Sequence, residues 1–320
     1  MPYDVVALGE LLIDLTQSGT SGQGNLLFEA NPGGAPANVL AMLRKLGRSC
    51  AFLGKVGADG FGDILADTLQ SARIDTRALL RDKDVHTTLA VVHTFENGDR
   101  DFSFYRKPGA DVNLTADELD EETLRACRVF HFGSLSLTDE PARTATRRAV
   151  ALARAGGAIV SYDPNLRPPL WDSDEEARRQ IAWGLAQCDV LKIADNEVEF
   201  MCGTADFDKG AAMLREQYPN IRLLCITAGA GGSYAWCGAY RAYEPACALG
   251  GVIETTGAGD TFCACVLHDV LRGGLDGMTE PRLHAMLRYA NAAAYLVTTK
   301  RGALRSMPEP DEIDAVLAKM

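Results

Sequence analysis

The chain has 320 residues, of which 47% are hydrophobic and 23% charged, a composition typical of a globular protein with one major domain. Its net charge of -11 argues against a nucleic-acid partner, which would require a basic face, although helix N-termini or local arginines can still hold a small anion. No apolar run approaches the length of a membrane span, and residues 1–15 have no basic leader before their apolar residues, so we expect a cytoplasmic protein without a membrane partner.

The nine cysteines are scattered along the chain and form no Cys-x-x-Cys pair. Several of them lie inside apolar segments, such as residues 223–226 and 262–267. This distribution predicts reduced, buried thiols.

The first quarter of the chain contains a short β-type run, residues 4–10, and a helical segment, residues 39–47. Asp14 follows the strand, where α/β proteins tend to place ligand groups, although a turn aspartate is the other interpretation. Gly33 and Gly34 precede the helix and allow its backbone to approach a ligand, and Asn38 projects an amide from the first turn.

A strand over residues 49–56 and a helix over residues 61–72 come next. Two β-type runs, residues 87–95 and 101–105, are then joined through Asn97-Gly98, which is a strong hairpin signal. We expect this hairpin to belong to a small sheet projecting from the main body, formed by segments of about 11–31 and 85–111. Arg106, just after it, could reach over a site or lie on the solvated surface.

Strands and helices alternate from residue 128 onward, which predicts a doubly wound, mostly parallel sheet flanked by helices. The strands are residues 129–132, 158–163, 190–194 and 221–226; the helices between them fall at about 140–155, within 175–187 and at 197–202. Ligands bind at the carboxyl ends of such strands, here residues 133–134, 163–167, 195–199 and 227–232. The last segment could instead be a hairpin loop, because residues 233–237 and 239–244 resemble two further strands.

A second glycine-rich helix opening, Gly257-Ala258-Gly259, precedes the apolar helical run of residues 262–271. Its bare N–H groups should attract an anion. Asp260 either caps this helix or accepts a proton from a substrate held beside a phosphate.

Several kinds of chemistry are excluded by missing motifs. The chain has no P-loop, no Gly-x-Gly-x-x-Gly after the first strand, no His-Glu-x-x-His and no Gly-x-Ser-x-Gly, and its five histidines do not cluster. Carboxylates and anion-binding helix starts remain, and this combination suits phosphoryl transfer.

Two segments carry a specific resemblance. Residues 33–38, followed by Gly47, and residues 255–262 are similar to the first and second signatures of the ribokinase-like (PfkB) sugar kinases, with agreeing order and spacing along nearly the whole chain. The resemblance implies a doubly wound α/β fold with a small β-sheet lid, and ATP with Mg²⁺ as the phosphoryl donor.

The resemblance also assigns roles to individual residues. It implies that Asp260 is the base and that the amides of Gly257, Ala258 and Gly259 form an anion hole. Sugar contacts are implied for Asp14, Gly33, Gly34, Asn38, Arg106 and Arg167; nucleotide contacts for Asn196, Thr227, Gly229, Gly232 and Asn291; and a water-mediated Mg²⁺ contact for Glu199.

One position departs from the family pattern. The residue before the Thr-Thr pair is commonly an aspartate that binds an activating monovalent cation, and here it is Glu254. The additional methylene shifts the carboxylate, so K⁺ activation is a hypothesis for this chain.

Within the family, residues 9–14, 104–111 and 163–171 are similar to fructokinases. The resemblance therefore implies transfer of the γ-phosphoryl of ATP to the 6-hydroxyl of D-fructose. A 2-keto-3-deoxygluconate kinase, which carries a comparable Asp-Pro-Asn-x-Arg segment, is the alternative, and a sugar- or nucleotide-binding protein without turnover is the alternative from another class. Related kinases often form a homodimer through the lid.

Overall fold

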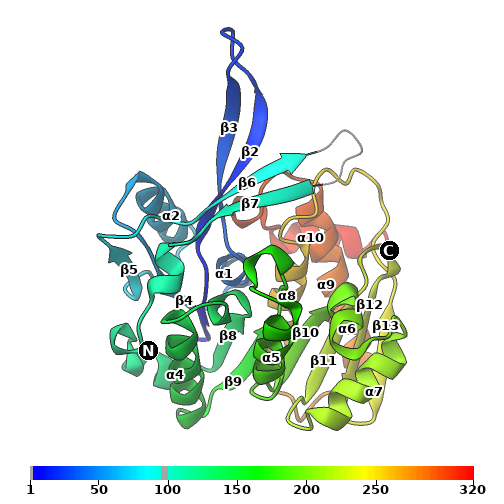
Figure 1. Ribbon diagram of the computed structural model, residues 1–320. Coiled ribbons are helices and arrows are strands. Elements are labelled where there is room, and N and C mark those ends of the chain that lie inside the picture. Colours follow the sequence, from blue (N-terminus) through cyan, green and yellow to red (C-terminus); the bar gives the residue numbers. More distant parts are fainter. Residues whose placement is uncertain (1–2, 95–99) are drawn as a thin grey trace.

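The computed structural model describes residues 3–94 and 100–320, which form two sheets (Figure 1). The large sheet has nine strands in the order β13-β12-β11-β10-β9-β8-β1-β4-β5. Its strands are β1 (Val5–Leu8), β4 (Cys50–Gly57), β5 (Leu79–Asp82), β8 (Val129–Gly133), β9 (Ile159–Asp163), β10 (Val190–Ala194), β11 (Leu223–Thr227), β12 (Ser233–Cys237) and β13 (Tyr240–Glu244). All neighbouring pairs from β5 to β11 are parallel, and β12 and β13 are added antiparallel.

Helices cover both faces of this sheet and bury two separate hydrophobic cores. One core contains residues of α1 (Ala35–Lys45), α2 (Gly60–Ser71), α8 (Ala258–Gly273), α9 (Glu280–Thr298) and α10 (Pro310–Leu317). The other contains residues of α3 (Glu121–Ala126), α4 (Ala142–Ala155), α5 (Asp174–Leu185), α6 (Asp195–Cys202) and α7 (Phe207–Gln217). Parallel strands covered on both faces are apolar along most of their length, which explains the apolar runs of β1 and β11. The predicted doubly wound fold is confirmed.

The small sheet stands above the main body and has the order β3-β2-β6-β7 (Figure 1). It consists of β2 (Leu12–Thr20), β3 (Leu26–Gly33), β6 (Leu89–Thr94) and β7 (Arg100–Tyr105). The predicted pairing of β6 with β7 is confirmed, with Leu89 opposite Tyr105, while the Asn97-Gly98 turn lies outside the described residues. We call this sheet the lid.

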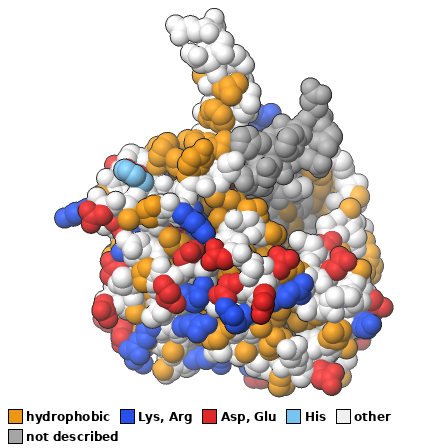
Figure 2. Space-filling model, in the orientation of Figure 1, with side chains coloured by type: hydrophobic (Ala, Val, Ile, Leu, Met, Phe, Trp, Pro, Cys, Tyr) orange, Lys and Arg blue, Asp and Glu red, His pale blue; other side chains and the backbone are white. Residues whose placement is uncertain are grey.

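The projecting arm of the lid carries few charged side chains, and hydrophobic ones appear on its lower part (Figure 2). Leu26, Leu27 and Phe28 on the edge strand β3 are 57%, 47% and 44% exposed. An apolar surface on an unpaired strand edge is a typical place for contact with another chain.

One local prediction needs correction. Asp14 does not lie in a turn after the first strand, because it lies inside β2 of the lid and pairs with Asn31 of β3. Residues 228–232 join β11 to the antiparallel β12, so the segment at the carboxyl end of β11 is also a hairpin connection between two strands.

Most of the cysteines are buried, and all nine are free thiols, with Cys202 and Cys247 half-buried. Within residues 3–94 and 100–320, none of the helices combines the length and apolarity needed to cross a bilayer.

Candidate active site

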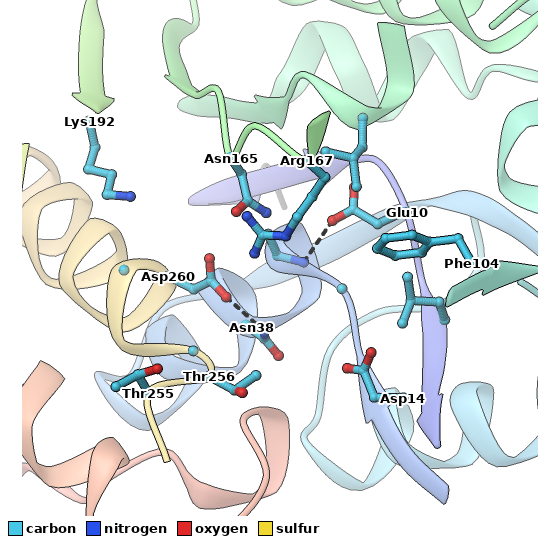
Figure 3. A pocket seen from close by; sticks show the side chains of 16 residues that line it. Glu10, Asp14, Asn38, Phe104, Asn165, Arg167, Lys192, Thr255, Thr256 and Asp260 are labelled. Carbon is cyan, nitrogen blue, oxygen red and sulfur yellow. Dashed lines mark hydrogen bonds between the residues drawn. The ribbon is translucent and has the colours of Figure 1, made fainter. Parts of the chain in front are cut away.

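A cavity of about 370 Å³ lies between the lid and the large sheet, where α1 and α8 begin (Figure 3). It brings together most of the residues assigned to sugar binding and catalysis. Its lining comprises Glu10, Leu12, Asp14, Gly34, Ala35, Asn38, Phe104, Leu135, Asn165, Arg167, Lys192, Thr255, Thr256, Gly257, Gly259 and Asp260.

Asp260 lies in the first turn of α8, directly after the glycine turn. Gly257 precedes the helix with φ of 82°, a left-handed conformation that favours glycine, and no side chain caps the helix. The amides at the start of α8 therefore have no side-chain acceptor, as an anion-binding helix start requires, although the amide of Ala258 donates to the carbonyl of Thr255 at 3.2 Å. Gly257 and Gly259 line the cavity. Asp260 is not this cap; its carboxylate is partly exposed to the cavity and accepts a hydrogen bond from Nδ2 of Asn38 at 2.8 Å.

The surroundings of Asp260 set its proton affinity. Burial raises the pKa of Asp260 to about 6, and the nearby charge of Asp163 acts in the same direction. The hydrogen bond from Asn38 and the charges of Lys192 and Arg167 partly offset this rise. A carboxylate with a pKa of about 6 is ionised at neutral pH and is a stronger base than an ordinary aspartate.

The start of α1 is fixed against the end of β1. Gly34 has φ of 129°, and a Cβ atom there would lie 2.4 Å from the carbonyl oxygen of Glu10. Glu10 is buried and accepts a hydrogen bond from the amide of Ala35 at 2.9 Å. This close approach positions Asn38 one turn later, with its Nδ2 on Asp260 and its buried Oδ1 without a partner in the described part of the chain. That oxygen is available to accept a hydrogen bond from a hydroxyl group of a ligand.

Two further carboxyl groups face the cavity with altered pKa values. Burial raises the pKa of both Asp14 and Glu10 to about 7. Gly33 makes room for Asp14, since a Cβ atom at Gly33 would lie 2.5 Å from Oδ2 of Asp14. Carboxyl groups with raised pKa values in a cavity are typical of a functional site.

Arg167 and Arg106 have different surroundings. Arg167 lines the cavity from the loop after β9, and this loop is fixed by Glu197, whose carboxylate accepts a hydrogen bond from the amide of Leu166 at 2.7 Å. Arg106 is buried outside the lining, with hydrogen bonds to Asp111 at 2.8 Å, Thr138 at 2.8 Å and the carbonyl of Leu135 at 2.7 Å. Its guanidinium links the end of the lid to the main body.

The residues assigned to the nucleotide lie outside the cavity lining. Asn196 and Glu199 are exposed on α6, and Thr227, Gly229 and Gly232 lie at the connection between β11 and β12. Asn291 is buried, donates to the carbonyls of Glu244 and Pro245 at 3.2 and 3.0 Å, and accepts from Ser233 at 2.9 Å. Its amide therefore holds the chain after β13 in place.

Metal-binding groups are few. In residues 3–94 and 100–320 there is no group of three or more His, Cys, Asp or Glu side chains that could hold a metal ion. Glu254 accepts a hydrogen bond from Thr256 at 2.5 Å and lines a small cavity with Asp14, Asn31 and Gly302. Asn196 and Glu199 of α6 are exposed, and side-chain oxygens are the ligand type that Mg²⁺ prefers.

Comparison with known proteins identifies the family. The model of the pfkB family carbohydrate kinases matches residues 3–310. The chain belongs to this family. It is 42% identical over 306 residues to a probable fructokinase-2 of Arabidopsis thaliana, an alignment that covers 95% of this chain and 92% of the relative.

Solved structures of the family have the same fold. A fructokinase from Xylella fastidiosa with bound ATP superposes with a TM-score of 0.90 at 29% identity, covering 99% of each chain. A fructokinase from Vibrio cholerae O395 with fructose, ADP and calcium ion bound has a TM-score of 0.86 at 30% identity, covering 98% of this chain and 99% of that chain. Both likenesses extend over the lid and the main body.

Several lining residues had no role assigned from the sequence, namely Glu10, Phe104, Asn165 and Lys192. Glu10, Phe104 and Asn165 lie within the segments that resemble fructokinases, and this resemblance could have indicated that they line the sugar site. Lys192 lies in the otherwise apolar strand β10, and a charged residue inside a buried strand is the feature that could have indicated a functional role.

The hydrogen bond from Asn38 predicts a shift in the pH dependence of phosphoryl transfer. In the wild type, kcat should fall as the pH decreases through about 6, because the base must be ionised. Asn38→Ala removes a donor that favours the ionised form of Asp260, so the pKa of Asp260 rises and the acid limb should move about one pH unit higher. The measurement is kcat against pH at saturating substrates.

Asn165→Ala is the matched control, because it removes another amide of the same cavity for which the structure gives no hydrogen bond to Asp260. This variant should leave the acid limb in place. An unchanged limb in Asn38→Ala would contradict the assigned effect of the hydrogen bond.

Proposed function

We propose that this protein transfers the γ-phosphoryl group of ATP to the 6-hydroxyl of D-fructose. The observation that carries the proposal is the half-buried Asp260 carboxylate, held by Asn38 at the start of α8, where no side chain caps the helix, in a cavity large enough for a sugar. The similarity over 95% of the chain to a probable fructokinase, and to a fructokinase with fructose and ADP bound, supports this acceptor.

The chemistry of this cavity follows from its charges. Asp260 accepts the proton of the sugar hydroxyl while the hydroxyl oxygen forms a bond to the γ-phosphorus and the bond to the ADP oxygen breaks. The amides of Gly257 and Gly259, which line the cavity, would stabilise the negative charge on the oxygens of the phosphoryl group, whereas the amide of Ala258 donates to the carbonyl of Thr255 at 3.2 Å. Asp14, Asn38 and Arg167 bind the remaining hydroxyls and orient the sugar. Gly33 and Gly34 contribute by leaving space, and Arg106 contributes by holding the lid.

In the proposed arrangement, ATP binds on the side of α6 and the β11–β12 connection, with its γ-phosphate at the start of α8. Asn196 and Glu199 would hold Mg²⁺ through water, and Mg²⁺ supplies charge neutralisation of the phosphates. Thr227, Gly229 and Gly232 border the nucleotide, and Asn291 positions the segment beside it through the carbonyls of Glu244 and Pro245.

The acceptor is tested by an ADP-release assay with fructose, 2-keto-3-deoxygluconate, ribose and adenosine. Fructose should give the highest kcat/KM, and NMR of the product should show the phosphate on O6. Arg167 in the cavity could pair with the carboxylate of 2-keto-3-deoxygluconate, so a higher kcat/KM for that acid would favour the alternative kinase. A 1-phosphate product would overturn the regiochemistry, and binding without ADP release would indicate a non-catalytic binding protein.

Potassium should activate the enzyme. The support is Glu254, whose carboxylate lines a small cavity with Asn31 and Gly302 at the position of the family's cation ligand. Activity is compared in potassium, sodium and Tris, and Glu254→Asp, which restores the usual ligand, should lower the potassium concentration needed for half-activation. Equal rates in all three buffers would reject a potassium site.

The lid supports a homodimer formed with a second copy of the chain. Leu26, Leu27 and Phe28 form an exposed apolar strip on an edge strand, and a paired lid would cover it. Sedimentation should show a dimer that Phe28→Glu dissociates, whereas Met213→Glu, at a 40% exposed residue of α7, should not change the mass. A monomeric wild type would contradict this assembly.

The free thiols are consistent with a cytoplasmic location, which cell fractionation tests.

A further inference from the structure

A buried lysine projects into the candidate active site from the central strand β10 (Figure 3). The Lys192 side chain is 8% exposed, and its Nζ lies 3.1 Å from Oδ2 and 3.3 Å from Oδ1 of Asp163, at the end of the neighbouring strand β9. A buried lysine is rare and needs a charged partner, which Asp163 supplies.

The ammonium group is packed against the glycine turn of α8. A Cβ atom built on Gly259 would lie 2.9 Å from Nζ of Lys192, so a glycine at this position leaves the space that the ammonium occupies. Both residues line the cavity that contains Asp260. The positive charge is thus adjacent to the amides that face the phosphoryl group.

Negative charges on three elements act on the ammonium. Asp163 of β9 is its direct partner, and Glu197 of α6, Asp260 of α8 and the thiol of Cys263 also interact with it electrostatically, as does the buried imidazole of His131 on β8. Burial by itself would lower the pKa of Lys192, but the negative charges outweigh burial and raise its pKa above the usual range. Lys192 therefore stays charged over the whole working pH range.

The ammonium has unused donor capacity. A lysine carries three N–H donors, and Asp163 is the hydrogen-bond acceptor that the structure gives Lys192 among the described residues. Lys192 lines the cavity, so its ammonium group can be reached from there. An oxygen of a phosphoryl group at the start of α8 would satisfy a second donor.

We propose that Lys192 is a further catalytic residue, whose ammonium, held by Asp163 against Gly259, contacts the phosphoryl group during its transfer to the sugar. The inference rests on the proposed function, because it requires phosphoryl transfer in this cavity. Lys192 remains protonated throughout: the proton of the acceptor hydroxyl goes to Asp260, and Lys192 stabilises the negative charge on the phosphoryl oxygens.

The test compares the affinities of the proposed product and of the sugar. Fructose 6-phosphate carries the transferred group, whereas fructose lacks it, so Lys192→Met should weaken binding of fructose 6-phosphate about 10- to 100-fold, as loss of a charged hydrogen bond predicts. Fructose binding should stay within about twofold. Both affinities are measured by calorimetry in the presence of ADP, and the variant should also lose kcat more than it raises KM for fructose.

Lys55→Met is the matched control. Lys55 is also a buried strand lysine, paired with Glu118 at 2.6 Å and Asp82 at 3.8 Å, but it lies in β4 outside the cavity lining. Its removal takes the lysine away from the buried carboxylate of Asp82, much as Lys192→Met does for Asp163, yet it should not change the ratio of the two affinities.

If Lys192→Met does not fold, the double variant Lys192→Met/Asp163→Asn removes both charges and should show the same selective loss. Equal loss of fructose and fructose 6-phosphate binding, or an unchanged ratio, would overturn the role of Lys192. Failure of the wild type to bind fructose would instead reject the proposed function, so the two failures are distinguishable.

Discussion

The structure depends on keeping an ionised carboxylate at the start of α8 in a partly buried position. Burial and the charge of Asp163 raise the pKa of Asp260. A higher pKa makes the carboxylate a stronger base, but it also increases the fraction of Asp260 that is protonated and therefore inactive. The Asn38 hydrogen bond and the charges of Lys192 and Arg167 oppose this rise and leave a pKa of about 6. The site therefore balances basicity against ionisation, and each of these neighbours belongs to a different element of the fold.

Contacts with the backbone connect the site around Asp260 to the rest of the molecule. The approach of Gly34 to Glu10 fixes the start of α1, and α1 packs beside α8 in the same hydrophobic core. Glu197 couples α6 to the sugar-side loop, because its carboxylate accepts from the amides of both Ala194 and Leu166. Arg106 similarly joins the lid to the segment after β8. The sugar side and the nucleotide side are thus connected through buried polar contacts rather than through loose loops.

The sequence predicted the features that depend on local pattern. Alternating strands and helices from residue 128 indicated the parallel sheet, and the two glycine-rich helix openings indicated where a ligand binds. Contacts between distant residues were not predictable in this way: the bond between Asn38 and Asp260 spans 222 positions, and it forms only when α1 and α8 pack together. For the same reason, the buried hydrogen bonds of Arg106 to Thr138 and of Asn291 to Ser233 could not be predicted from their motifs. Lys192 was not singled out because nothing in the local sequence pairs it with Asp163.

The most direct measurement of the central claim is to replace Asp260 with asparagine and determine kcat and the affinity for fructose on the same preparation. The asparagine keeps the shape of the side chain but cannot accept the hydroxyl proton, so kcat should fall at least about 10²- to 10⁴-fold while fructose affinity changes little. An equal loss of affinity and turnover, or a variant that retains its kcat, would contradict the assignment of Asp260 as the base.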